Sequence, residues 1–142
     1  MYSDRNLVYI LTILEAIEKL YIYSEKFDNA YDFWINKNQL NYNASSNLLI
    51  TIGEATKKID DELKIKFSNI EWNAISDLRN RLAHDYRGSD PDLLWQIITE
   101  ELTDLKNAIN EMLQFVKYDK KMLEDALNSE YYKNIQYLKS LL

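Results

Sequence analysis

The sequence predicts an all-α protein, an up-and-down helical bundle of about five to seven helices. Only two glycines and one proline occur among 142 residues, and so few helix breakers favour long helices. Apolar residues recur at steps of three and four along most of the chain. No segment of useful length alternates as a β-strand does, and no internal repeat or linker is visible. We therefore expect a single domain over residues 1–142.

The N-terminal third predicts one long and one short helix. The long helix covers about residues 4–24. Its apolar stripe consists of Leu7, Ile10, Leu11, Leu14, Ile17, Leu20 and Tyr21. A shorter helix follows over residues 28–37, with Phe33 and Trp34 as its anchors. Residues 38–44 are polar, and we expect them to be irregular or to form an early helical turn.

A second long helix is expected over residues 45–65, with Gly53 in its interior. A glycine there costs about 1 kcal/mol relative to alanine, so we expect that another backbone approaches closely at this point. Ser68 and Glu71 have the spacing of a capping box and predict a helix from residue 69 to residue 84 or 86.

The C-terminal half predicts one long helix and two short ones. Gly88 ends the preceding helix, and Asp90 caps the next one with Pro91 at its first position. That helix continues to about residue 117, and residues 120–128 and 130–140 each form another. The last of these carries apolar side chains that can dock on the bundle or on a partner: Tyr131, Tyr132, Ile135, Tyr137 and Leu138.

Composition and charge exclude several classes of protein. The chain has no cysteine and one histidine, so we expect neither a disulfide framework nor a structural zinc site. No run of eighteen apolar residues appears, and the first twenty residues lack the features of a signal peptide, so a soluble cytoplasmic protein is the default expectation. A net charge of −6 counts against a protein that coats nucleic acid, but a local cationic cleft is compatible with it.

Residues 78–88, LRNRLAHDYRG, gather three arginines and the only histidine of the chain. These residue types suit phosphate chemistry on RNA. Arg79 offers a bidentate fork for a phosphodiester, and the imidazole of His84 titrates near neutral pH and can move protons. A base that takes the proton of a 2′-OH lets that oxygen attack the adjacent phosphorus, while a cation stabilises the developing charge. Asn80 and Tyr86 would position the phosphate.

The geometry of a helix raises a difficulty, because residues five apart point about 140° away from each other. Arg79 and His84 can converge if the helix unwinds near His84, or if two copies of the segment face each other in a dimer. On an ideal helix the core stripe comprises Ile75, Leu78, Leu82 and Tyr86. Arg87 shares the stripe of His84 and either binds phosphate or is simply exposed.

Other charged residues near this segment have simpler interpretations. Arg81 stands four residues from both Asp77 and Asp85, so we expect a solvated ladder of ion pairs. Lys57 and Lys58 could line the same cleft, although a solvated helix face is the preferred interpretation.

The segment RNRLAHDY resembles the Arg-x4-His-x-Tyr signature of HEPN-domain ribonucleases. The segment ITIGEATKKI looks like the IGEA helix of the HepT-like subgroup, IEWNAISDLRNRLAHDY resembles its signature helix, and DPDLLWQIITEEL its next helix. The resemblance covers roughly residues 5–116, and residues 119–142 look like a C-terminal extension. One departure is that Leu102 and Thr103 stand where relatives often carry a proline.

The resemblance implies a helical homodimer with the motif in an interfacial cleft, and a toxin that cuts RNA without a metal. It also implies a two-gene module whose other product, a minimal nucleotidyltransferase, is the antitoxin. Such a partner can transfer AMP to the motif tyrosine, here Tyr86, and phosphates added beside Arg79 would repel RNA. The expected partners are therefore RNA, the nucleotidyltransferase and a second copy of this chain. No cofactor, metal, membrane or DNA is expected.

Two alternatives to a ribonuclease toxin remain at this point. The bundle could be a non-catalytic adaptor that presents a surface or Tyr86 to the nucleotidyltransferase, and the net charge of −6 favours this slightly because an acidic protein repels RNA. The chain could also be the antitoxin of a toxic nucleotidyltransferase. It is not expected to be the transferase, because it carries no glycine-rich phosphate loop and no paired-carboxylate metal motif.

Overall fold

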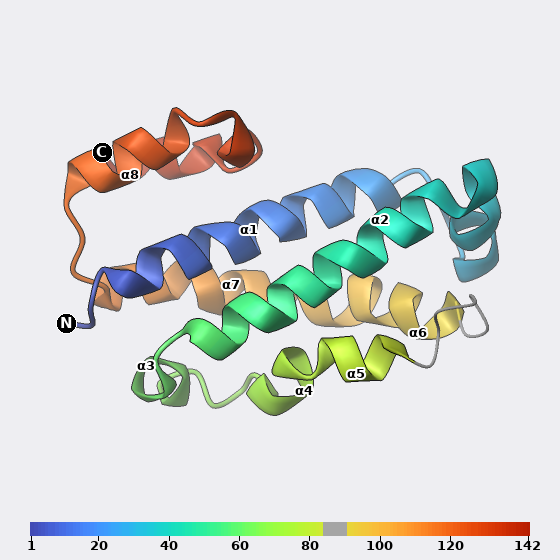
Figure 1. Cartoon of the computed structure of the whole chain (residues 1–142), viewed down its shortest axis with the longest axis horizontal. Coiled ribbons are helices and arrows are strands. Elements are labelled where there is room, and N and C mark those ends of the chain that lie inside the picture. The colour runs from blue at the N-terminus through green and yellow to red at the C-terminus, as the bar shows by residue number, and fades with distance from the viewer. Residues whose placement is uncertain (84–90) are drawn as a thin grey trace.

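The structure, a computed structural model, describes residues 1–83 and 91–142 and is built from helices. Figure 1 shows α1 (Arg5–Ser24) and α2 (Ala30–Lys58) side by side and running in opposite directions, with α7 (Leu102–Met112) behind them. Within the described ranges the only strand-like pairing is an isolated bridge between Tyr2 and Val116. The predicted all-α fold is therefore confirmed.

The long helix α1 lies at the centre of the core. Its predicted apolar stripe is buried from Leu7 to Leu20, with Ile10, Leu14 and Ile17 fully inaccessible to solvent. Because this stripe follows the 3.6-residue period and packs on α2 and α7, local pattern and tertiary contact agree here. None of the described helices is both long and apolar enough to cross a membrane.

The second helical region differs from the prediction at both ends. α2 starts at Ala30 and contains a kink, where Lys37, Asn38 and Gln39 have φ values of 50°, 57° and 69°. The second helix therefore begins directly after the kink instead of at residue 45, because Tyr42 turns inward and is buried.

The same region ends at Lys58, seven residues before the predicted end at residue 65. The backbone N–H of Asp60 donates to the side chain of Asn6 at 2.9 Å, so it is not available to continue the helix. Ile59 is extended, and a separate short helix, α3 (Asp61–Ile65), follows.

The predicted capping box at Ser68 and Glu71 is wrong. Helix α4 (Trp72–Ser76) starts three residues late, and its cap residue Glu71 makes no side-chain capping bond. The indole N–H of Trp72 donates to the carbonyl oxygens of Lys64 and Phe67, at 2.9 and 3.0 Å, so the chain turns before the helix starts. A further break at Asp77 separates α4 from α5 (Leu78–Ala83).

The next segment starts as predicted, with Pro91 as the first residue of α6 (Pro91–Gln96). The expected continuous helix contains a π-helical stretch, η1 (Ile97–Glu101), before α7, and ends in the 3-10 turn η2 (Leu113–Phe115). Trp95 packs on the fully buried Phe33, with ring centroids 5.4 Å apart. The start of α2 is thereby anchored against α6. Asp90 and Gly88 lie outside the described residues.

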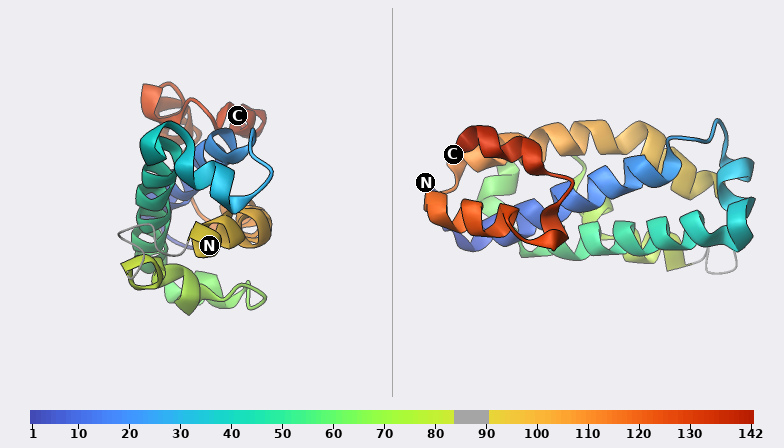
Figure 2. Two further views of the ribbon diagram at one scale, coloured as in Figure 1. Left: turned by 90° about the vertical axis from the view of Figure 1, so that its right-hand side faces the viewer. Right: turned by 90° about the horizontal axis from the view of Figure 1, so that it is seen from above.

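The C-terminal extension folds over α1, as Figure 2 shows from two further sides. It consists of α8 (Lys120–Leu127) and two 3-10 segments, η3 (Glu130–Tyr132) and η4 (Gln136–Leu141), so the single helix predicted over residues 130–140 is wrong. The backbone N–H of Asn134 donates to the carboxylate of Glu15 in α1 instead of to a helix carbonyl. Ile135 and Leu138 are buried, so the extension docks on the bundle.

Candidate functional site

Helix α5 carries the described part of the sequence motif, and its apolar face is fixed in the core. Leu78 and Leu82 are 1% and 4% exposed, and Ile75 in the preceding α4 is 4% exposed. These are the described members of the predicted core stripe, whose fourth member, Tyr86, lies outside the described residues. With the leucines pointing inward, the other faces of α5 are turned toward solvent or neighbouring helices.

The distance between α5 and α2 is set by Gly53. A Cβ atom added at Gly53 would lie 2.9 Å from the carbonyl oxygen of Ile75 and 3.4 Å from the Cβ of Leu78. A carbon atom that close to the backbone oxygen of Ile75 would force α2 and α4 apart. The expected close backbone approach at this glycine is therefore confirmed, and it brings α4 and the start of α5 against α2.

Arg79 and Asn80 are both exposed on α5. Asn80 donates a hydrogen bond from its amide nitrogen to a carboxylate oxygen of Asp77, one turn earlier. Within the part of the chain that the structure describes, no side chain forms an ion pair with Arg79. An exposed guanidinium without an internal partner can bind an incoming anion in bidentate fashion.

Arg81 does not belong to the predicted ladder with Asp77. Its two terminal nitrogens donate to the two carboxylate oxygens of Glu101, at 3.2 and 3.0 Å, and the pair joins α5 to η1. The two side chains are 26% and 28% exposed, so this ion pair is partly shielded from water. Glu101 was not singled out from the sequence, because a pair twenty residues apart follows no local spacing rule.

The remaining predicted site residues are His84, Tyr86 and Arg87, which lie outside the described residues together with Asp85. Their roles as acid or base, positioning group and phosphate ligand stay predictions. Along residues 1–83 and 91–142, no group of three or more His, Cys, Asp or Glu side chains is arranged as a metal site.

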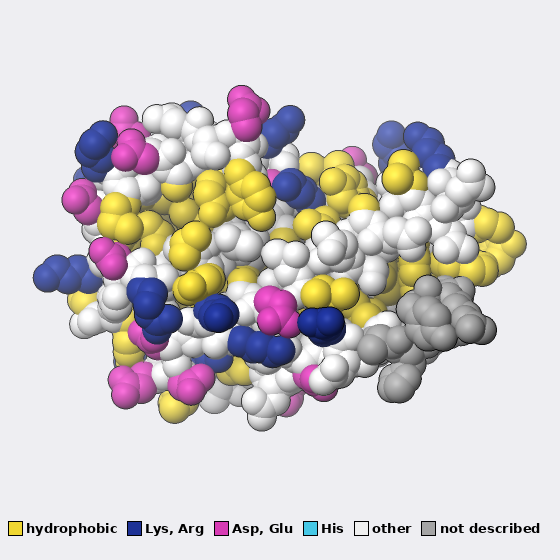
Figure 3. Space-filling view, viewed as in Figure 1, with side chains coloured by type: hydrophobic (Ala, Val, Ile, Leu, Met, Phe, Trp, Pro, Cys, Tyr) yellow, Lys and Arg dark blue, Asp and Glu magenta, His cyan; other side chains and the backbone are white. Residues whose placement is uncertain are grey.

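Cationic side chains gather near the end of α2, against which α4 and α5 pack. Figure 3 shows Lys and Arg, with some Asp and Glu between them, over the C-terminal part of α2. Lys57 pairs with Glu54 at 3.4 Å, and Lys58 is exposed. The Lys57–Glu54 pair fits the preferred interpretation of a solvated helix face.

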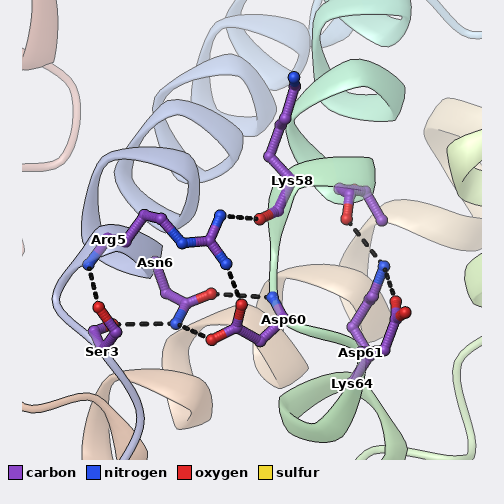
Figure 4. Close-up of polar contacts among 8 residues, drawn as sticks. Ser3, Arg5, Asn6, Lys58, Asp60, Asp61 and Lys64 are labelled. Atoms are coloured by element: carbon purple, nitrogen blue, oxygen red, sulfur yellow. Dashed lines mark hydrogen bonds and ion pairs between the residues drawn. The ribbon is translucent and has the colours of Figure 1, made fainter.

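The end of α2 that supports this region is held to α1 by a polar cluster. Figure 4 shows Asn6, which is fully buried, bonded to both the backbone N–H and the carboxylate of Asp60. Arg5 donates to the carbonyl oxygen of Lys58 at 3.2 Å and pairs with Asp60. Because these groups satisfy one another, the junction between α2 and α3 is firmly attached to α1.

Comparison with known proteins identifies the family. The family model described as "Ribonuclease HepT-like" matches residues 13–112, which is more than half of the chain. The chain belongs to the HepT-like ribonuclease family. This confirms the family and the ribonuclease class predicted from the motif. The C-terminal extension lies beyond the last matched residue, whereas Glu15, which Asn134 of the extension contacts, lies within the match.

Curated relatives carry corresponding names. "Putative RNase MJ1380" of Methanocaldococcus jannaschii is 33% identical over 101 residues, which cover 71% of this chain and 90% of that protein. "Probable ribonuclease HepT" of Thermococcus cleftensis is 33% identical over 61 residues, or 43% of this chain and 56% of that protein. No solved structure matches the chain significantly.

Proposed function

We propose that this HepT-like ribonuclease is an endoribonuclease toxin that cleaves RNA without a metal ion. His84 takes the proton of a ribose 2′-OH or protonates the leaving 5′-oxygen, and the 2′-oxygen attacks the adjacent phosphorus. The guanidinium of Arg79 binds the phosphoryl oxygens as their charge grows. The products are a 2′,3′-cyclic phosphate and a free 5′-hydroxyl.

The observation that supports this proposal best is the state of Arg79. It is exposed and has no ion-pair partner within the described ranges, while the leucines on either side of it along α5 are buried. The leucines keep the helix against the core, and the guanidinium is free to bind an anion. A cation that is already positioned stabilises a transition state better than one that must first reorganise.

Two copies of the chain would complete the site. Arg79 and His84 lie about 140° apart around an ideal helix, so one copy needs local unwinding to bring both to one phosphate. In a homodimer, Arg79 of one copy can meet His84 of the other. Asn80, Tyr86 and Arg87 then add donors for the RNA backbone.

Control by a nucleotidyltransferase antitoxin is the second part of the proposal. AMP attached to Tyr86 would place a phosphate close to Arg79, where it would occupy the guanidinium and repel RNA. Intact mass of the protein, produced with and without a neighbouring nucleotidyltransferase gene, tests this directly. An unchanged mass in both preparations would contradict the modification.

RNA cleavage by the purified protein in EDTA tests the catalytic proposal. We expect cyclic phosphate ends, strongly reduced cleavage by Arg79→Ala and His84→Ala, and restored growth of cells that express either variant. Lys121→Ala is the matched control, because Lys121 is 78% exposed on α8 and far along the chain from α5. If both motif variants stay as toxic as the parent protein, the assignment of the site is wrong.

One observation favours a second candidate, a non-catalytic adaptor. The net charge of −6 disfavours RNA binding, whereas it does not oppose a contact with a basic patch on another protein. The adaptor predicts an intact complex with the nucleotidyltransferase and no RNA cleavage by the unmodified protein. Expressing each gene alone further separates these roles from that of an antitoxin.

A further inference from the structure

Helix α5 is short, and its apolar contacts do not fix its orientation completely. Six residues give fewer than two turns, and among residues 78–82 only Leu78 and Leu82 are buried. Two inward side chains on one stripe stop the helix from moving away from the core. They leave a rolling motion about that stripe, which would displace Arg79 on the outer face.

The ion pair between Arg81 and Glu101 opposes this motion. Arg81 leaves α5 on a different side from the leucines, and its guanidinium forms two hydrogen bonds of 3.2 and 3.0 Å with one carboxylate. Such a bidentate pair fixes direction as well as distance. Partial burial of both side chains reduces screening by water and salt.

The carboxylate of this pair belongs to an element that is packed in the core. Glu101 is the last residue of η1, whose Ile97 and Ile98 are 0% and 3% exposed. A π-helical turn accommodates an extra residue compared with an α-helical turn, so it changes the direction in which the following side chains point. The side chain of Glu101, at the end of η1, points toward α5, where its carboxylate accepts from Arg81.

The surroundings of Glu101 make Arg81 the more important member of the pair. A small pocket of about 140 Å³ between α4 and the η1–α7 segment is lined by Glu71, Glu100, Glu101 and Asp104. Three other acidic residues therefore line the same pocket as Glu101. Without Arg81, the carboxylate of Glu101 would lose its ion-pair partner and would no longer hold α5.

We propose that Arg81 and Glu101 form a positioning pair that holds α5, and with it Arg79, in the orientation needed for RNA cleavage. The inference rests on the proposed ribonuclease function for its effect on rate. Because both terminal nitrogens of Arg81 are already bonded to Glu101, Arg81 acts through the helix and does not bind RNA. Arg79, two residues earlier, is left as the described arginine on α5 that can bind phosphate.

Steady-state cleavage of a short single-stranded RNA carrying a fluorophore and a quencher tests this role in the full-length protein. We expect Glu101→Gln to lower kcat about tenfold and Arg81→Ala up to about a hundredfold, with KM changed less than about twofold. Arg81→Lys should restore little, because an ammonium group cannot form the bidentate bond. The exchanged pair Arg81→Glu with Glu101→Arg should recover part of kcat.

Glu18→Gln is the matched control. Glu18 in α1 pairs with Lys106 in α7 at 3.0 Å, and the two side chains are 17% and 29% exposed, which is similar to the Arg81–Glu101 pair. We expect Glu18→Gln to lower the thermal midpoint as much as Glu101→Gln while kcat stays unchanged. Equal losses of kcat in both variants would reduce the pair to a contribution to stability and overturn the inference. A lower KM in Glu101→Gln would also overturn it, because Arg81 released from Glu101 would then bind RNA.

Hydrogen–deuterium exchange separates this inference from the proposed function. We expect Glu101→Gln to accelerate amide exchange at residues 78–83 at least tenfold, and Glu18→Gln to leave it unchanged. This readout needs no RNA cleavage. A parent protein that does not cut RNA refutes the proposed function, while unchanged exchange at residues 78–83 in Glu101→Gln refutes the positioning pair.

Discussion

Helix α5 and the C-terminal extension each carry a polar residue, Arg79 and Asn134, and these two residues differ in their partners. The side chain of Arg79 is exposed and has no ion-pair partner within the described ranges, whereas Asn134 is bonded to a buried carboxylate. In the extension, Asn134 donates from its backbone and its side chain to Glu15, which is 1% exposed. An exposed free cation contributes little to folding, whereas a buried carboxylate with two donors contributes substantially. The difference separates residues available for a ligand from residues needed for the fold.

The strongest test of this comparison is Arg79→Ala. We expect the rate of RNA cleavage to fall about 100- to 1,000-fold, because the group that stabilises the transition state is lost. The free energy of unfolding should change by less than about 0.5 kcal/mol, since the side chain is exposed. RNA cleavage and urea unfolding, measured on the same preparation, check both parts. A large loss of stability would show that Arg79 holds the fold together.

Glu15→Gln should give the opposite result. A glutamine can accept from only one of the two donors of Asn134, and its own amide N–H group would face the other donor. We expect a loss of about 1–3 kcal/mol in the free energy of unfolding and faster amide exchange over residues 130–138, with RNA cleavage unchanged. Glu130→Gln is the control, because Glu130 is exposed in the same extension. Equal effects of the two variants would contradict the importance of burial.

Gly53→Ala tests the comparison by disturbing the contact of α2 with α4 and α5 while leaving Arg79 unchanged. Alanine gains about 1 kcal/mol in helix propensity, but its Cβ would meet the backbone oxygen of Ile75, and overpacking costs about 1–3 kcal/mol. We expect a net loss of stability, seen as a lower thermal midpoint, and slower RNA cleavage. Asn47→Ala, at an exposed position of α2, should instead be slightly stabilising. A more stable Gly53→Ala variant would show that α4 can move away freely.

The smallest effect concerns alkaline pH and the contacts of the extension with α1 and α7. Burial lowers the pKa of Lys106, but its hydrogen bond and ion pair with Glu18 raise it more, so the pKa lies above its usual 10.5. Burial raises the pKa of Tyr137 above 10.0. A hydrogen bond with Asn110 and the positive charge of Lys106 lower this pKa, but the net effect is still upward. The folded state therefore favours the protonated form of both groups.

The stability from these two groups is fully present below about pH 10 and is lost as the pH rises through the raised pKa values. Urea unfolding at pH 9, 10 and 11 should show this decline. Glu18→Gln should flatten it, because the raised pKa of Lys106 depends on Glu18. A decline of the same size in both proteins would assign it to other groups.

The sequence-based predictions were accurate where a feature depends on residues close together in the chain, and less accurate where it depends on contacts between distant segments. The apolar stripe of α1 and the start of α6 at Pro91 agree with the structure, because both depend on neighbouring residues. The close approach at Gly53 was also predicted, since an unfavourable glycine inside a helix needs a reason. The capping-box prediction was wrong because the indole N–H of Trp72 donates to the carbonyl oxygens of Lys64 in α3 and of Phe67 just after it.

The features of the candidate site can also be separated into those set by the local sequence and those set by contacts between helices. The sequence by itself determined which residue types are present in the motif, which face of α5 carries Leu78 and Leu82, and that an all-α bundle would form. Only the tertiary structure decided that Arg81 pairs with Glu101 and that the extension docks on α1 through Glu15. The reason is physical: helical periodicity is a property of adjacent residues, whereas the partner of a polar side chain depends on which helices pack beside it.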